Sequence, residues 1–434
     1  MRASSLVLLG LLSLGGVAAV GCSGDPDVDF PPGTTATTSS GGGGDATGGG
    51  GSGASTSTGG GEGGAGGGEG GAGGGAGGEG GAAPVCTPEG PFDGDPVAAP
   101  PGAWTWVPVP EARCRNGSAT GFGVRMNPAS DKLMIYLEGG GACFNTTSCV
   151  ANPSSYAESN FNGWKGGGGQ SGIFATDNVD NPVREWNAVF IPYCTGDIHG
   201  GDATGVDVPG IGAPSNQSFV GYANIGHDLK RILPTFPGVT EVLLTGVSAG
   251  GFGAAYNYDR IAQAFCPRPV WLIDDSGPPM GDAYLAPCLQ SRWRDLWNLG
   301  FTLPNDCVNC TGPDGGGIVN YTTFLADKYP SSRLGLISSN RDNVISLFFG
   351  YGQNNCANID GFTGPISGAE YTAGLEDLRD NHLTSAVWAT YFIDSTQHTW
   401  IGGGSYDTAE VGGVRLRDWV GAHVTTGTAG HVGP

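Results

Sequence analysis

The chain has 434 residues, a formal net charge of −21 and 83 glycines. Its acidity, together with the lack of any cluster of Lys and Arg in the sequence, argues against nucleic acid as a partner. All ten tryptophans lie beyond residue 85, and the stretch from there to the end, about 350 residues, is long enough for one large α/β domain.

The first 22 residues have the pattern of a secretory signal. A positive charge precedes an apolar stretch over 6–20, which is too short to span a membrane comfortably. The small residues before Cys22 resemble the lipobox of bacterial lipoproteins, in which this cysteine becomes the lipidated first residue. By the same resemblance, Ser23 at the next position favours sorting to the outer membrane. We expect 1–22 to be a lipoprotein signal peptide. The protein would then be exported and held at the bacterial outer membrane or cell surface, touching the membrane only through its lipid.

Residues 23–84 have a composition that cannot build a hydrophobic core. Residues 41–81 alone contain 26 of the 83 glycines, interspersed with Ala, Ser, Thr and a few Glu. Such a segment buries too little apolar surface to offset its chain entropy. We expect a disordered Gly-rich tether that supplies reach and no catalytic chemistry.

Ten cysteines follow Cys22, and an even number in an exported chain favours disulfides. They lie at positions 86, 114, 143, 149, 194, 266, 288, 307, 310 and 356. Cys307 and Cys310 have the spacing of half a zinc site, but no second Cys-x-x-Cys or His pair accompanies them. We therefore expect up to five disulfides, and neither a metal nor an organic cofactor.

Short apolar runs alternate with helix-like stretches along residues 85–434. We expect strands over 133–137, 186–191, 242–244, 270–273 and 333–338, and a helix over 224–233 that ends before Pro234. Fully apolar strands separated by helical segments indicate a mainly parallel sheet covered on both faces. The pattern predicts an α/β-hydrolase-like fold, whose sites form at the carboxyl ends of the strands.

Ser248 lies at the apex of a predicted strand–turn–helix. The run Gly246-Val-Ser-Ala-Gly250 follows an apolar strand and precedes small helix formers. This is the context of a nucleophile elbow, where glycines permit a tight turn. In a chain so rich in glycine the bare motif is weak, and an ordinary Gly-rich turn is the alternative. The flanking strand and helix favour a nucleophile.

A serine nucleophile needs a histidine base, and the elbow architecture places the base after both the serine and the acid in the chain. His398 opens a loop after the apolar run 387–393, a strand or a buried helix, and is favoured as the base. His423, in the Gly/Thr-rich terminus, is the main alternative. His382 lies in a polar run typical of a solvated helix face.

Asp342 is favoured as the acid because it lies just beyond the expected strand 333–338, and the elbow architecture usually takes its acid from a later strand. Asp274 and Asp275, after strand 270–273, are the alternatives. Asp342 could instead cap a helix beginning near Asn343.

The oxyanion of the reaction needs two backbone N–H groups. One is expected from Ala249, directly after the nucleophile. The other is expected from the Gly-rich loop 139–141, where glycines let the backbone approach the substrate closely. A plain Gly-rich turn is the alternative for this loop.

Six motifs in order resemble the pectin acetylesterase/Notum family of carboxylesterases. They are Cys114-Arg-Asn-Gly-Ser-Ala-Thr-Gly-Phe122, Leu137-Glu-Gly-Gly-Gly-Ala-Cys143, Ile191-Pro-Tyr-Cys-Thr-Gly-Asp197, Gly246-Val-Ser-Ala-Gly-Gly251, Asp275-Ser-Gly277 and Gln397-His398. The resemblance implies Ser248 as nucleophile, Asp342 as acid and His398 as base. It also implies the oxyanion donors Gly140, Gly141 and Ala249, and the disulfides Cys143–Cys149 and Cys114–Cys194.

Two positions depart from the family pattern. Val247 stands where the family often has Cys, and Ala142 stands where it usually has Trp, one wall of the acyl pocket. The resemblance implies a serine carboxylesterase that deacetylates O-acetylated polysaccharide through an acyl-serine. We expect the protein to be a monomer. Lipid-acyl or aryl esters are an alternative substrate class, and a non-catalytic surface-binding lipoprotein is an alternative function. The intact Ser/Asp/His set argues against the latter.

Overall fold

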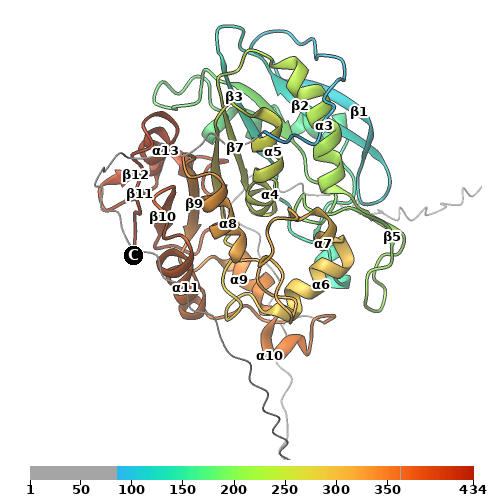
Figure 1. Ribbon diagram of the computed structural model, residues 1–434. Coiled ribbons are helices and arrows are strands. Elements are labelled where there is room, and N and C mark those ends of the chain that lie inside the picture. The colour runs from blue at the N-terminus through green and yellow to red at the C-terminus, as the bar shows by residue number, and fades with distance from the viewer. Residues whose placement is uncertain (1–85, 362) are drawn as a thin grey trace, which may run out of the picture. The chain divides into compact units, whose positions relative to one another are not determined.

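An eight-stranded sheet forms the centre of the computed structural model, which describes residues 86–361 and 363–434 (Figure 1). The strand order is β1-β2-β4-β3-β7-β8-β9-β10. The strands are β1 (Thr105–Arg113), β2 (Ala119–Arg125), β3 (Lys132–Leu137), β4 (Asn187–Ile191), β7 (Glu241–Val247), β8 (Val270–Asp275), β9 (Leu334–Ser339) and β10 (Trp388–Ile393). β4 and the strands from β3 to β10 pair in parallel. The predicted α/β-hydrolase-like fold with a mainly parallel sheet is confirmed.

Helices cover both faces of this sheet. They are α1 (Thr146–Ala151), α2 (Glu158–Trp164), α3 (Gly221–Thr235), α4 (Ala249–Tyr256), α5 (Tyr258–Phe265), α6 (Pro287–Trp297), α7 (Leu299–Thr302), α8 (Asn320–Lys328), α9 (Asn343–Gly350), α10 (Gln353–Cys356), α11 (Gly368–Asp377), α12 (Ser405–Thr408) and α13 (Leu416–Thr425). Shorter elements are η1 (Gly168–Gln170), η2 (Gly172–Phe174), η3 (Leu378–His382) and the two small hairpins β5 (Ala203–Val206)/β6 (Gln217–Phe219) and β11 (Glu410–Val411)/β12 (Val414–Arg415).

Alternate side chains of the strands enter two separate cores. In β3, Leu133 and Ile135 pack with residues of α3, α5 and α8, whereas Met134 and Tyr136 pack with residues of α2 and α13. This alternation follows from the two-residue period of a strand. It explains why strands buried on both faces read as continuous apolar runs.

The antiparallel pair β1–β2 lies at the edge of the sheet and was not predicted. β1 contains Pro108 and Pro110, and β2 contains two glycines, so neither reads as a strand in the sequence. An edge strand tolerates proline because half of its backbone groups face away from the sheet.

The predicted end of the helix over 224–233 is wrong. α3 runs from Gly221 to Thr235 and contains Pro234 in its last turn. Proline has no N–H to donate to the carbonyl of Lys230, four residues earlier. The N–H of Gly94 donates to that carbonyl instead, at 3.0 Å, which allows the helix to continue past the proline.

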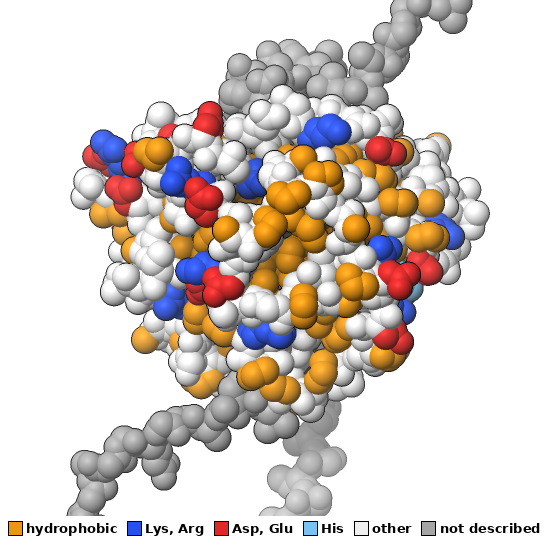
Figure 2. All heavy atoms as spheres, turned by 90° about the horizontal axis from the view of Figure 1, so that it is seen from above, with side chains coloured by type: hydrophobic (Ala, Val, Ile, Leu, Met, Phe, Trp, Pro, Cys, Tyr) orange, Lys and Arg blue, Asp and Glu red, His pale blue; other side chains and the backbone are white. Residues whose placement is uncertain are grey.

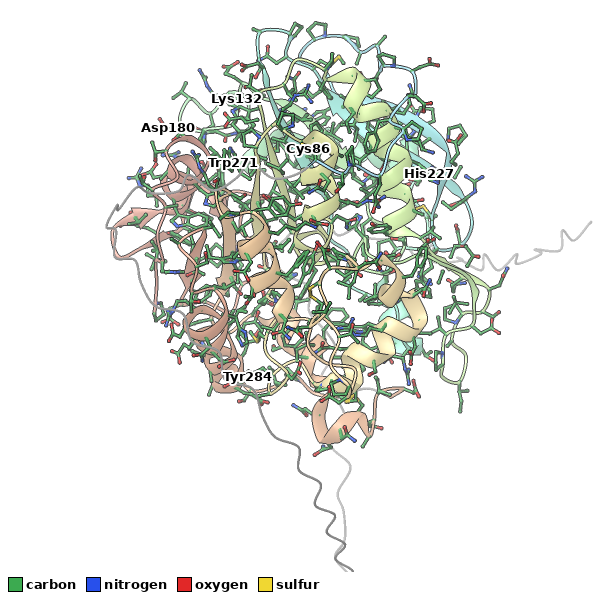
Figure 3. All side chains as sticks on the ribbon, in the orientation of Figure 1. Cys86, Lys132, Asp180, His227, Trp271 and Tyr284 are labelled. Atoms are coloured by element: carbon green, nitrogen blue, oxygen red, sulfur yellow. A yellow bond between two sulfur atoms is a disulfide. The ribbon has the colours of Figure 1, made fainter. Side chains whose placement is uncertain are left out.

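The amino and carboxyl ends of the parallel strands carry different kinds of side chains. Figure 3 shows Lys132 and Trp271, near the amino ends of β3 and β8, at one end of the fold, and Tyr284 at the other. Figure 2 views the first of these ends, where hydrophobic side chains are surrounded by interspersed positive and negative ones. There the side chain of Arg333 stacks over Trp271 at 4.2 Å from the ring centre. The candidate catalytic residues lie at the opposite, carboxyl ends of the strands.

The signal peptide over 1–22 with Cys22, and the tether over 23–84, lie outside the described residues. Within the part of the chain that the structure describes, none of the helices has the length and apolar character needed to cross a membrane.

Candidate active site

Ser248 occupies a sharp turn between β7 and α4. Its backbone has φ 57° and ψ −123°, a strained conformation for a residue with a side chain. The turn fits because glycines stand two residues before and after Ser248: a Cβ on Gly246 would lie 2.3 Å from the carbonyl oxygen of Gly250, and one on Gly250 would lie 2.0 Å from the carbonyl oxygen of Leu137. The sequence prediction of a strand–turn–helix at Ser248 agrees with this geometry, which has the form of a nucleophile elbow.

Asp275, the last residue of β8, connects this turn to a second loop. Its carbonyl oxygen accepts the N–H of Ser248 at 2.8 Å. Its carboxylate accepts the N–H groups of Trp400 and Ile401 at 2.7 and 2.8 Å, and the hydroxyl of Ser276. Burial raises the pKa of Asp275 to about 6, against the effect of these hydrogen bonds.

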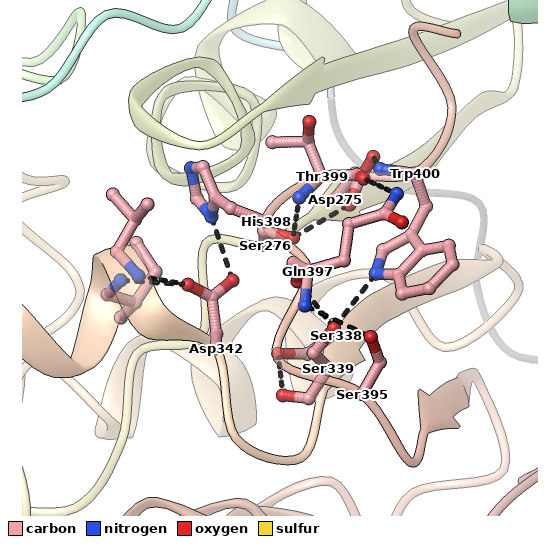
Figure 4. Close-up of polar contacts among 12 residues, drawn as sticks. Asp275, Ser276, Ser338, Ser339, Asp342, Ser395, Gln397, His398, Thr399 and Trp400 are labelled. Atoms are coloured by element: carbon pink, nitrogen blue, oxygen red, sulfur yellow. Dashed lines mark hydrogen bonds and ion pairs between the residues drawn. The ribbon is translucent and has the colours of Figure 1, made fainter. Parts of the chain in front are cut away.

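His398 lies in the loop that Asp275 holds, and it is bound to Asp342 (Figure 4). Its Nδ1 lies 2.8 Å from Asp342 Oδ2. The other oxygen of Asp342 accepts the N–H groups of Val344 and Ile345 at 2.8 and 2.9 Å, which caps α9. The two interpretations of Asp342, partner of a histidine and helix cap, are therefore both realised, one by each oxygen.

The other ring nitrogen of His398, Nε2, has no hydrogen-bond partner among the described residues. It is buried, and it forms no bond to Ser248 Oγ here. Burial by itself lowers the pKa of His398, but the charge of Asp342 and its hydrogen bond raise it more, with a contribution from Asp275. The net result is a pKa above the ordinary value of 6.5.

The remaining histidines after Ser248 lie elsewhere. His423, the main alternative base, is buried in α13, where its Nε2 lies 3.0 Å from the carbonyl oxygen of Leu272 and its ring stacks on Trp419. His382 lies 3.7 Å from the carboxylate of Asp377. His431 contacts a threonine hydroxyl at 3.0 Å. Asp342 pairs with His398 and with none of these.

The loop 139–141 packs directly on the turn at Ser248. A Cβ on Gly139 would lie 2.5 Å from the carbonyl oxygen of Val247 and 2.9 Å from Ser248 Cβ. Gly141 has φ 77°, which favours glycine. Among described residues, no backbone carbonyl accepts the N–H of Gly140, Gly141 or Ala249. These three N–H groups are therefore available to a ligand. That of Ala249 is the first of α4, where N–H groups usually lack a partner within the helix.

Two residues that the sequence analysis did not single out support this loop. Asn152 Nδ2 donates to the carbonyl oxygen of Gly140 at 2.8 Å, which fixes the peptide plane whose other side carries the N–H of Gly141. Arg115 in turn donates from Nε to Asn152 Oδ1 and from Nη2 to Asn152 O, at 3.2 and 2.9 Å. Both side chains are at least 95 % buried. Arg115 lies inside the first of the six family motifs, Cys114–Phe122, but nothing in the sequence connects it with Asn152.

A small apolar pocket adjoins Ser248. Its volume is about 30 Å³, space for about two water molecules. Besides Ser248 it is lined by Gly141, Ala142, Ile198, Ala249, Phe252, Trp293, Ile345, Phe348 and Phe349. The ring of Phe348 comes within 3.3 Å of where a Cβ on Gly141 would lie. The space beside the nucleophile is therefore narrow even though Ala142 contributes little bulk.

All ten cysteines beyond residue 85 are paired. The disulfides are Cys86–Cys266, Cys114–Cys194, Cys143–Cys149, Cys288–Cys356 and Cys307–Cys310. They include the two pairs that the family resemblance implies. Cys143–Cys149 closes the segment between the glycine loop and Asn152, which adds to the rigidity of that loop.

The parallel sheet, the strained serine turn and the histidine–carboxylate pair at the carboxyl ends of the strands define a protein of the α/β-hydrolase-like class. The model of the Pectinacetylesterase family matches residues 105–309. The resemblance to the pectin acetylesterase/Notum family is confirmed over these residues. The match ends before Asp342 and His398, which the fold brings to the site.

Relatives of the chain include palmitoleoyl-protein carboxylesterases. The mouse NOTUM protein is 31% identical over 214 residues, which cover 46% of this chain and 38% of the mouse protein. The human protein is 30% identical over 35% of this chain and 30% of its own length, and the Drosophila melanogaster protein is 31% identical over 34% and 22%. The aligned region thus spans well under half of these relatives.

Proposed function

We propose that the chain is a serine carboxylesterase. The observation that carries the proposal is the pair His398–Asp342, joined at 2.8 Å with His398 Nε2 left unpartnered. It lies on a loop that Asp275 ties to the nucleophile turn. Resemblance to a family whose named relatives are carboxylesterases supports the same chemistry.

The proposed reaction uses Ser248, Asp342 and His398 as a triad. His398 Nε2 takes the proton of Ser248 Oγ as the oxygen attacks the ester carbonyl, while Asp342 holds the ring in the tautomer that leaves Nε2 free. The N–H groups of Gly140, Gly141 and Ala249 stabilise the oxyanion. His398 gives the proton from Ser248 to the departing alcohol, which makes the histidine a base again. It then takes a proton from water, which attacks the acyl-serine, and that proton returns to Ser248 Oγ as the acid is released.

The proposed substrate is an O-acetyl ester on a polysaccharide. The name of the matching family supports an acetylated polymer, and the pocket of about 30 Å³ beside Ser248 supports a short acyl group. The names of the Notum relatives point to a long acyl chain, which this pocket does not accommodate as it stands. We therefore place acetyl esters ahead of lipid-acyl esters, and both ahead of a purely binding role.

The proposed location rests on the sequence alone. We propose lipidation at Cys22, a tether over 23–84, and a monomer that contacts the membrane only through its lipid and needs neither cofactor nor nucleic acid. Mass spectrometry of the amino-terminal peptide tests the lipid. Deletion of residues 23–84 should leave kcat/KM for a soluble ester unchanged; a loss of activity would show that the tether does more than provide reach.

Comparison of wild type with Ser248→Ala tests the catalytic proposal. Wild type should release acetate from p-nitrophenyl acetate and from an acetylated pectin, and a fluorophosphonate should label Ser248. Ser248→Ala should lose activity by several orders of magnitude with its melting temperature retained, because triad members act as a unit. Labelling of another residue would overturn the assignment.

A further inference from the structure

A second cavity lies behind the pocket at Ser248. Its volume is about 50 Å³, and Ala255, Leu325, Leu336 and Trp388 are among its walls. Asp274, Gln290 and Arg294 also line it, but the surface exposed inside the cavity is almost entirely apolar. Ile198, Phe252 and Trp293 line both cavities. These three side chains therefore form the partition between the space beside the nucleophile and the space behind it.

The partition is fixed relative to the nucleophile. Phe252 is in the first turn of α4, and its N–H donates to the carbonyl oxygen of Ser248 at 3.0 Å. Trp293 stacks on Trp297 with ring centres 5.7 Å apart and planes 8° from parallel. The backbone of Phe252 and the ring of Trp293 are therefore held in place beside Ser248.

Ile198 completes the partition in an unusual backbone conformation. Its φ is 51°, a clear outlier for a β-branched residue. The hydroxyl of Tyr193 accepts its N–H at 2.8 Å and helps to hold it there. Such strain persists only where the surrounding structure enforces it, and it concentrates at functional sites.

We propose that Ile198, Phe252 and Trp293 set the upper limit on the acyl group of the substrate. The inference rests on the proposed esterase function and adds an acyl-length filter to it. With the partition closed, the pocket takes a short acyl group such as acetyl. When the partition is opened, the apolar cavity behind it becomes a site for a longer aliphatic tail, because the transfer of such a tail from water into an apolar cavity is favourable.

The test measures kcat/KM for p-nitrophenyl acetate, butyrate and hexanoate. Wild type should prefer acetate to hexanoate by about tenfold or more, since a single misfitting methylene is worth about 10–200-fold. Phe252→Ala joins the two cavities and should raise the ratio of hexanoate to acetate by about tenfold or more. Ile198→Ala opens the same partition from the other side and should change the ratio in the same direction.

Phe236→Ala is the matched control. Phe236 is a buried core residue at the end of α3 and lines neither cavity, so its loss should lower the melting temperature and leave the acyl-length ratio unchanged. Equal use of acetate and hexanoate by wild type would overturn the filter. So would an unchanged ratio in active partition variants, and in either case the esterase assignment would stand. A wild type that cleaves none of these esters would overturn the esterase assignment itself, and the filter with it.

Discussion

The backbone N–H of Ser248 donates to the carbonyl oxygen of Asp275 at 2.8 Å. The carboxylate of the same Asp275 holds the N–H groups of Trp400 and Ile401, just after His398. One residue thus connects the turn at Ser248 with the loop of His398, using its backbone for the first and its side chain for the second. The side-chain contact can therefore be removed without removing the contact to Ser248.

Asp275→Ala should lower the free energy of unfolding strongly and kcat only modestly. The change leaves the N–H groups of Trp400 and Ile401 unpaired, and each unpaired buried donor costs about 1–3 kcal/mol. Asp275→Asn should recover most of this loss, because its amide oxygen can accept both N–H groups while its nitrogen donates to Ser276. Denaturant unfolding and kcat measured on both variants test this. If Asp275→Ala kept wild-type stability but lost kcat by about 10⁴-fold, Asp275 would be the triad acid.

Asp342→Asn should show the opposite pattern. The amide oxygen can still cap α9, so the free energy of unfolding should change little. The amide nitrogen then faces His398 Nδ1 and favours the tautomer with the proton on Nε2, which cannot act as a base. The expected loss in kcat is about 10⁴-fold.

Asp342→Ala separates the two roles of this residue. It removes the helix cap as well as the histidine partner, so it should lose kcat and also about 0.5–2 kcal/mol of stability. Equal stability of the Ala and Asn variants would contradict the cap. Wild-type kcat in the Asn variant would contradict the triad.

The pH dependence of kcat/KM should follow His398. The base must be neutral, so activity is lost as the pH falls through the pKa of its ring. That pKa is raised by Asp342 and, less strongly, by Asp275, so the acid limb of wild type should lie above pH 6.5. Removing either charge lowers the pKa and should move the limb to lower pH, further in Asp342→Asn than in Asp275→Asn. A wild-type limb below pH 6.5, or one unmoved by both changes, would rule out this account.

The sequence predicts those parts of the site that depend on local patterns. Apolar runs indicate the central strands, and the run around Ser248 indicates the turn, because both are determined by neighbouring residues. The edge pair β1–β2 cannot be predicted in this way, because Pro108 and Pro110 argue against a strand unless the strand is known to lie at the edge of the sheet. The extension of α3 past Pro234 depends on Gly94, which lies about 140 residues away in sequence.

Other features of the site depend on contacts between distant segments. The role of Asp275 requires β8 to meet the loop after β10, 125 residues later. The partition at Phe252 combines a residue after the nucleophile with one from the loop after β4 and one from α6. No periodicity or motif reports such contacts, and they appear only in the folded chain.

Asn152 gives the last prediction, because its side chain contacts the backbone of the proposed oxyanion site. Its side chain donates to the carbonyl of Gly140 and thereby orients the N–H of Gly141. Loss of one direct oxyanion donor typically costs about 10²–10³ in kcat. Asn152→Ala leaves the donor in place but less well oriented, so kcat should fall about 10- to 100-fold with KM little changed.

Asn181→Ala is the control for that change. Asn181 is equally buried and donates to the carbonyl oxygens of Ile173 and Ala175 at 2.9 and 2.8 Å, away from the residues of the site. Its loss should lower the melting temperature and leave kcat near wild type. Because both variants remove a buried amide that bonds to a carbonyl, a general loosening of the fold would affect them alike. Only a specific role in the oxyanion loop would lower kcat in Asn152→Ala alone, and equal kcat values in the two variants would refute that role.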